Sequence, residues 1–342
     1  MKRNMKNWMY NLLRSQDTKA MPIISFPGAE LKSMNVLDVA SNGKNQYESI
    51  KVLSEKYPSI ANVTCMDLSV EAEAFGAEIR FTEIEVPTVI NGVIDNVQDV
   101  AKLSIPKVGD GRTGEYIKAA ELAAAQIKDR PTFAGMIGPY SLAGRLYDMT
   151  EIMTAIMEDP DEIHELLQKC TKFLIEYALA FKVAGANGII IAEPAAGLLS
   201  PGLCQEFSSN YVKEIVDAIQ DDYFMVILHN CGNAEKLVAS MVSTGAMGLH
   251  FGNAVDMMKI MPQVPWGRLA MGNIDPVKVM RFGSTDDVKK ATEELLWKAA
   301  IYKNFVLSTG CDVPLGSPQD NIQAFYDALE TFNRSIMIEV TA

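Results

Sequence analysis

Short apolar runs alternate with longer segments of helical period along most of the 342-residue chain. Each run is closely followed by Gly, Pro, Asn or Ser. The segment 160–184 places apolar residues at i, i+3, i+4 and i+7, which is typical of an amphipathic helix. This alternation predicts repeated strand–helix units and a parallel sheet. The eight predicted strands are 22–26, 62–66, 132–137, 188–192, 223–228, 246–249, 268–271 and 304–307.

Eight strands with intervening helices favour an α/β fold of the (β/α)8 TIM-barrel type, with 1–342 as a single domain. An open doubly wound sheet is the alternative, but no GxGxxG motif follows a predicted strand. Segments 27–60 and 70–130 are less regular, and 77–94 alternates in part like an antiparallel hairpin. We expect these segments to be insertions beside or over the barrel mouth.

The N-terminus predicts an amphipathic surface helix rather than a signal peptide, because its apolar residues recur at helical spacing without forming a continuous run. These residues are Met5, Trp8, Met9, Leu12 and Leu13. No segment approaches the roughly 20 apolar residues that a membrane-spanning helix needs. We therefore expect no membrane partner.

The charge and the cysteine content of the chain narrow the possible partners and the cellular compartment. The net charge is −12 and the Lys and Arg residues are scattered, which argues against nucleic acid as a partner. Five cysteines form an odd and widely spaced set, which argues against a disulfide framework and for a reducing compartment. We expect a cytoplasmic protein whose thiol chemistry belongs to individual cysteines.

Two predicted strands run directly into residues that bind metals. His229 and Cys231 follow the apolar run 223–228, and side chains two apart on an extended strand point to the same side. Cys311 comes just after the run 304–307. Because the C-terminal ends of barrel strands converge on one face, we expect all three side chains to meet there.

One imidazole and two thiolates suit zinc, and three protein ligands leave a position free for a substrate, as in catalytic zinc sites. The alternative to a metal site is that these residues only pack in the core, since His-x-Cys is a weak motif and a lone Cys after a strand is more often a core residue. The other cysteines, Cys65, Cys170 and Cys204, have no comparable place and are expected to be small buried side chains.

Several segments resemble the methylcobalamin:coenzyme M methyltransferases, a branch of the uroporphyrinogen decarboxylase superfamily. The resemblance covers most of the chain, roughly residues 21–332. The segments that carry it are 66–76, 137–143, 193–194, 229–232, 271–276 and 308–314.

This resemblance implies a zinc site made by His229, Cys231 and Cys311 at the mouth of a barrel. It also implies transfer of a methyl group between a corrinoid, methylcobalamin free or on a partner protein, and a small thiol such as coenzyme M. The sequence contains no corrinoid-binding Asp-x-His-x-x-Gly segment, so we expect the cobalamin to come from elsewhere. A thiol bound to zinc is deprotonated at neutral pH and becomes the nucleophile.

Two other activities stay open. Uroporphyrinogen decarboxylases carry an arginine-bearing segment after the first strand, whereas this chain reads Ser25-Phe-Pro-Gly-Ala-Glu30. Asp67, however, resembles the aspartate with which the decarboxylases bind pyrroles. The other possibility is a corrinoid-dependent demethylase that keeps the same zinc and takes a different methylated substrate.

Further candidate residues follow predicted strands. Glu193 is expected to face the mouth and, with Asp67, to take a catalytic role, by orienting a zinc ligand, by serving as a further ligand or by contacting the substrate. Asp275, Tyr140 and Pro139 are candidates for cofactor binding. The alternatives are a salt-bridged rim glutamate for Glu193, a turn and helix cap for Asp275, and turn chemistry at Pro139.

Overall fold

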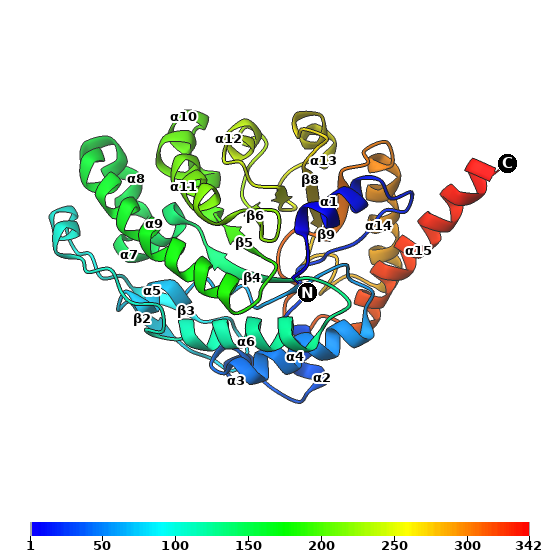
Figure 1. The fold of residues 1–342 in the computed structure, drawn as a ribbon, viewed down its shortest axis with the longest axis horizontal. Coiled ribbons are helices and arrows are strands. Elements are labelled where there is room, and N and C mark those ends of the chain that lie inside the picture. Colours follow the sequence, from blue (N-terminus) through cyan, green and yellow to red (C-terminus); the bar gives the residue numbers. More distant parts are fainter. Residues whose placement is uncertain (1, 342) are drawn as a thin grey trace.

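The computed structural model describes the backbone of residues 2–341 and the side chains of residues 2–336. Its main sheet has seven parallel strands in the order β1-β4-β5-β6-β7-β8-β9. Figure 1 shows this curled sheet at the centre, with helices arranged around its outer side. The strands are β1 (Asn62–Val63), β4 (Thr132–Ile137), β5 (Gly188–Ala192), β6 (Met225–Asn230), β7 (Gly248–Phe251), β8 (Leu269–Ile274) and β9 (Phe305–Thr309).

Helices precede or follow almost every strand, as the alternating pattern predicts. The α-helices are α1 (Met5–Leu13), α2 (Pro27–Leu31), α3 (Val36–Ala40), α4 (Gly43–Lys56), α5 (Val70–Ala74), α6 (Thr113–Gln126), α7 (Pro139–Tyr147), α8 (Met149–Glu158), α9 (Pro160–Val183), α10 (Pro201–Cys204), α11 (Asn210–Ile219), α12 (Val238–Ser243), α13 (Met257–Ile260), α14 (Thr285–Ala299) and α15 (Gln319–Thr341). Shorter turns of other helix types are η1 (Val97–Lys102), η2 (Pro194–Leu198), η3 (Gln205–Ser209) and η4 (Met261–Gln263).

The predicted strand 22–26 does not form as a regular strand, so the main sheet has seven strands and not eight. The backbone just before it bonds to both edges of the sheet: Met21 N donates to Leu307 O at 2.9 Å, and Ile60 N donates to Ala20 O at 3.0 Å. Pro22 has no N–H to donate. Ile23 N donates to the Thr309 side chain instead of a backbone carbonyl, which ends the regular ladder.

Two predicted strands, 132–137 and 188–192, have the observed bounds. Four others continue two or three residues beyond their predicted ends, into polar residues such as His229, His250 and Ser308. Hydropathy alone assigns such residues to loops. The ladder hydrogen bonds of the sheet extend through them, so they lie on rigid strands.

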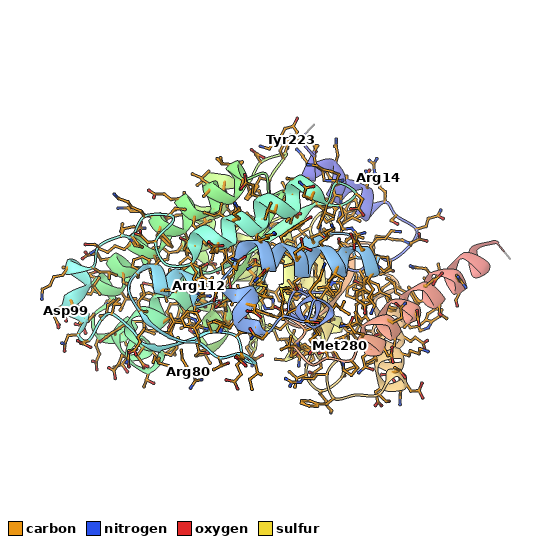
Figure 2. All side chains as sticks on the ribbon, turned by 90° about the horizontal axis from the view of Figure 1, so that it is seen from below. Arg14, Arg80, Asp99, Arg112, Tyr223 and Met280 are labelled. Carbon is orange, nitrogen blue, oxygen red and sulfur yellow. The ribbon has the colours of Figure 1, made fainter. Side chains whose placement is uncertain are left out.

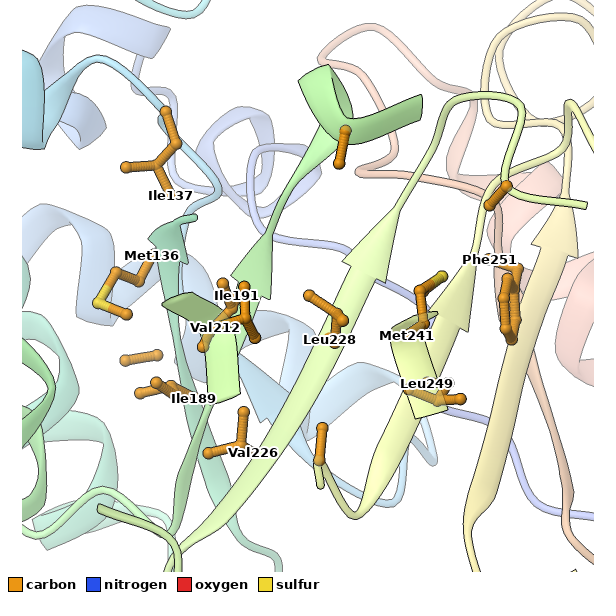
Figure 3. Packing of buried hydrophobic residues seen from close by; sticks show 14 of the residues in the cluster. Met136, Ile137, Ile189, Ile191, Val212, Val226, Leu228, Met241, Leu249 and Phe251 are labelled. Carbon is orange, nitrogen blue, oxygen red and sulfur yellow. The ribbon is translucent and has the colours of Figure 1, made fainter. Parts of the chain in front are cut away.

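Alternate residues of each strand contribute to two different cores. Ile189, Ile191 and Val226 face the surrounding helices, where α11 supplies Val212 (Figure 3). Ile190 belongs to a second cluster on the inner face of the sheet. The other strand residues of this inner cluster are Val63, Phe133, Met225, Ile227, Leu269, Met271 and Val306.

Helix α1 covers this inner cluster at one end. Met5, Met9 and Leu13 are buried and pack into it, which confirms the amphipathic N-terminal helix. Their i, i+4, i+8 spacing places the three side chains along one helix face.

The two less regular segments contain more ordered structure than expected. Strands β2 (Glu78–Arg80) and β3 (Thr88–Asn91) pair antiparallel, which confirms the hairpin. Segment 27–60 contains α4 and segment 70–130 contains α6, and these two helices pack against each other beside the sheet (Figure 1). Both segments therefore supply helices to the outer layer as well as insertions.

Within residues 2–341, none of the helices combines the length and apolar character that crossing a membrane would require.

Candidate metal centre

The three residues predicted to bind a metal lie together. His229 is on β6 and Cys231 follows directly after it, while Cys311 follows the end of β9. The ligand atoms of the three residues all lie within 4.8 Å of one another. The curl of the sheet brings β6 and β9, which are three strands apart, to one site.

The imidazole of His229 has one nitrogen without a partner. His229 is only 2% exposed, and its Nε2 makes no hydrogen bond among the residues that the structure describes. Buried polar atoms are nearly always paired, so such an atom points to a missing ligand. This nitrogen carries a free lone pair if the ring proton is on Nδ1.

The two cysteines differ in their affinity for protons. A hydrogen bond from the Cys311 thiol is the largest cause that lowers the pKa of Cys231, and His229 adds to it against the effect of burial. The same hydrogen bond, together with burial, raises the pKa of Cys311. The pair therefore shares a proton and holds one thiolate readily. A metal ion would replace this shared proton.

Behind His229, a row of hydrogen bonds crosses the inner face of the sheet. His229 Nδ1 lies 2.8 Å from His250 Nδ1, and His250 Nε2 lies 2.8 Å from Ser308 Oγ. Ser308 Oγ in turn donates to the Met21 carbonyl at 2.8 Å. Burial lowers the pKa of His250 well below its usual value, and His229 adds to this effect.

Hydropathy alone does not predict this row. His250 follows the predicted strand 246–249, at the end where the barrel mouth is expected, and Ser308 follows the predicted strand 304–307. The register of the sheet supplies the missing signal, because His229 and His250 are direct partners on β6 and β7. Polar residues at inward positions of neighbouring strands therefore indicate a row of hydrogen bonds across the sheet.

Asp312, next to Cys311, was also not predicted. Burial raises the pKa of its carboxyl to about 7, and Ser25 Oγ donates to its Oδ2 at 2.9 Å. Ser25 lies within segment 22–26, which does not form the predicted strand, so this bond fixes the loop after β9 to the N-terminal part of the chain.

Glu193 lies at the end of β5, as expected, but its carboxylate is directed at the N-terminus of α7. Its Oε1 accepts from Ser141 N at 2.6 Å and its Oε2 from Tyr140 N at 3.1 Å. Burial raises its pKa to about 7, while hydrogen bonds from Ser141 oppose this shift. The residue is 2% exposed, so it is not a rim glutamate. It is connected to the metal candidates through its backbone N–H, which donates to His229 O at 2.8 Å.

Asp67 is buried in an ion pair. Its Oδ2 accepts from Arg112 Nη1 at 2.6 Å and from Tyr116 Oη at 3.0 Å. Its Oδ1 accepts from the backbone and the hydroxyl of Ser69. Arg112 is buried, whereas Arg80 is exposed (both are labelled in Figure 2). These four hydrogen bonds give Asp67 a structural role, and its catalytic role stays a prediction.

The three predicted cofactor-binding residues occupy structural positions. Asp275 accepts from the backbone N–H groups of Val277 and Lys278, which confirms the turn, but the following residues form turns and the next helix, α14, has Ser284 as its cap, so Asp275 caps no helix. The Tyr140 side chain is fully buried, with its hydroxyl 3.2 Å from Met153 Sδ. Pro139 is the first residue of α7. Ligand binding by these residues stays a prediction.

The remaining cysteines, Cys65, Cys170 and Cys204, are free and buried, as expected of small core side chains.

Comparison with known proteins gives two kinds of relatives. The chain is 27% identical over 350 residues to the methylcobamide:CoM methyltransferase MtbA of Methanosarcina acetivorans, covering 96% of this chain and 98% of that protein. It is 26% identical over 272 residues to a uroporphyrinogen decarboxylase of Prochlorococcus marinus, covering 76% of each.

Among solved structures, a methyltransferase from Methanosarcina mazei has a TM-score of 0.86 at 22% identity, with 96% of this chain and 99% of that chain covered. This likeness concerns the fold. The model of the family described as Uroporphyrinogen decarboxylase (URO-D) matches residues 9–332, which is nearly the whole chain. Because this match covers far more than half of the chain, the chain belongs to the uroporphyrinogen decarboxylase (URO-D) family.

Proposed function

We propose that this protein is a zinc-dependent methyltransferase that moves a methyl group between a corrinoid and a thiol such as coenzyme M. The observation that carries the proposal is the convergence of His229, Cys231 and Cys311, with the unpartnered His229 Nε2 among them. The relatives named as methylcobamide:CoM methyltransferases support the reaction class.

The donor set fits zinc. Two sulfurs and one imidazole nitrogen are ligands that this borderline-soft ion prefers, and His229 Nε2 lacks any other partner among the described residues. Cys231 already favours the thiolate form that a metal needs. When bound there, zinc supplies the Lewis acidity that keeps a substrate thiol deprotonated at neutral pH.

The residues of the chain hold and orient the reacting groups. The ligands sit at or just beyond the ends of buried strands, which fixes their positions. In the transfer, the substrate thiolate attacks the methyl carbon, a sulfur–carbon bond forms, and the electron pair of the broken carbon–cobalt bond stays with the corrinoid. The thiol proton leaves to solvent before the attack.

The architecture supports the same assignment. We propose that the segment before β1, which bonds to both edges of the sheet, completes a (β/α)8 barrel within a single domain. The methyl donor would be methylcobalamin, free or on a partner protein. We place the reaction in the cytoplasm, because all five cysteines are free.

A decarboxylase is the second candidate, since several relatives carry that name. Asp67 argues against it here, because Arg112, Tyr116 and Ser69 occupy both of its carboxylate oxygens. A demethylase that delivers a methyl group to a corrinoid would use the same three ligands and differ only in the methylated substrate.

The test is elemental analysis of protein purified without added metal, followed by an assay with methylcobalamin and a panel of thiols that includes coenzyme M. We expect about one zinc per chain, lost in Cys231→Ala and Cys311→Ala and kept in the buried control Cys170→Ala. Methyl transfer should follow the zinc content. Full activity of Cys311→Ala, or protein that takes up no zinc after reconstitution, would overturn the proposal.

A further inference from the structure

The row of hydrogen bonds behind His229 has a fixed direction, and this direction determines which nitrogen of His229 is free. The row begins at the Met21 carbonyl, which can only accept a hydrogen bond. Ser308 Oγ lies 2.8 Å away and donates its single proton to this carbonyl. The Ser308 oxygen must then act as the acceptor toward its other neighbour, His250 Nε2, at 2.8 Å.

The same reasoning assigns the proton of His250. Its ring is 1% exposed, and no carboxylate of the described residues bonds to it, so the neutral form is favoured. A neutral imidazole carries one N–H. Because Nε2 donates to Ser308, Nδ1 of His250 is an acceptor.

His229 completes the row. Its Nδ1 lies 2.8 Å from His250 Nδ1, and two ring nitrogens at this distance need one proton between them. That proton belongs to His229, since His250 Nδ1 has none. His229 therefore holds its proton on Nδ1, and its Nε2 presents a lone pair beside Cys231 and Cys311.

We infer that His250 and Ser308 are positioning residues that fix the tautomer and orientation of His229 for metal binding. The inference about the metal rests on the proposed function, whereas the tautomer itself is a property of the chain alone. Three barrel strands and the N-terminal segment contribute to the row, since His229, His250 and Ser308 lie on β6, β7 and β9. Its direction originates at a backbone carbonyl, which cannot change its protonation state.

The effect on metal binding should be measurable. Hydrogen-bond partners behind metal-binding histidines typically change metal affinity by about 10- to 100-fold when removed. Ser308→Ala leaves His250 Nε2 without its hydroxyl acceptor and allows His250 to reverse its tautomer. His229 would then gain a proton on Nε2, the atom that is needed for the metal.

The first experiment is NMR of protein with 15N-labelled histidine rings, in the metal-free and the zinc-loaded states. The chain has only three histidines, and the His164→Gln and His250→Gln variants assign the signals. His164 lies on α9, where its ring contacts Tyr211, away from the row. We expect the His229 proton on Nδ1 in metal-free protein. A proton on His229 Nε2 in the wild-type protein would overturn the inference, whatever the variants do.

The second experiment is zinc affinity by chelator competition. We expect Ser308→Ala to bind zinc about 10- to 100-fold more weakly, while Ser308→Thr, which keeps the hydroxyl, restores both affinity and tautomer. Thr244→Val is the matched control, because it removes a buried hydroxyl that donates to the Met241 carbonyl outside the row. Wild-type affinity in Ser308→Ala would refute the role of Ser308.

These outcomes separate the two proposals. An Nδ1 proton on His229 in a protein that takes up no zinc refutes the proposed function and leaves the tautomer assignment intact. Zinc bound by Cys231 and Cys311 together with a His229 proton on Nε2 refutes the positioning role and leaves the metal site intact.

Discussion

Glu71 should make the protein less stable as the pH rises from 4.5 to about 7, and Glu71→Gln should remove this effect. The residue lies on α5 and is 1% exposed. Its Oε1 accepts from Ile137 N at 3.0 Å, while its Oε2 is buried without a partner among the described residues. Burial raises its pKa from 4.5 to about 7, and the bond from Ile137 partly opposes the shift.

The sign follows from proton binding. Between pH 4.5 and 7 the folded protein holds the Glu71 proton and the unfolded chain releases it, so the free energy of unfolding falls as the pH rises through this window. Below 4.5 both states are protonated and the penalty is absent. Above 7 both are ionised and the penalty is complete. At about 1.4 kcal/mol per pKa unit, the full penalty is about 3 kcal/mol.

Glutamine keeps the acceptor for Ile137 N and has no charge to bury. The assay is urea unfolding of metal-free wild type and Glu71→Gln at pH 5, 6.5 and 8, with coincident circular dichroism and tryptophan fluorescence transitions as the check on two-state behaviour. We expect the variant to gain about 2–3 kcal/mol relative to wild type between pH 5 and pH 8. Glu121→Gln, an exposed substitution on α6, is the control. Parallel pH profiles for wild type and Glu71→Gln would refute the reasoning.

Three further predictions concern packing, charge and metal. Gly138→Ala adds a methyl group that collides with the Glu193 carboxylate, and thermal unfolding should reveal a loss of about 1–3 kcal/mol. Arg112→Met leaves Asp67 buried without its cation and should lower the free energy of unfolding by about 3–5 kcal/mol in chemical denaturation. Adding Asp67→Asn should recover part of this loss, and additive effects of the two substitutions would contradict the ion pair. Chelation of zinc should lower the melting temperature of wild type and leave that of Cys311→Ala unchanged in calorimetry, because only a protein that binds the ion loses the stabilisation.

The sequence by itself determined the positions of seven of the eight predicted strands and of the two helices with a regular apolar spacing, α1 and α9. Apolar runs such as 132–137 and 188–192 appear as strands with the predicted bounds, because a strand buried on both faces is apolar throughout. Helices α4 and α6 were harder to find. Helix α4 buries Gln46 and Ser49, and α6 buries mostly alanine, so neither shows a strong apolar stripe.

Part of the candidate site was also determined locally. The two-residue period of a strand places His229 and Cys231 on one side, and this holds in any fold that keeps β6 extended. The proximity of Cys311 to His229 and Cys231 is not determined locally, because it depends on the curl of the sheet that brings β9 back toward β6.

Only the tertiary structure decided the partners of the polar residues. Asp67 meets Arg112, 45 positions away, and Glu193 meets the start of α7, more than 50 positions away. His250 and Ser308 form a hydrogen-bonded row with His229 because the register between strands and the path of the N-terminal segment bring these side chains together. Residue types and spacing fix which side of a strand a group faces. Hydrogen-bond partners across the sheet depend on register and curvature, which result from the packing of the whole core.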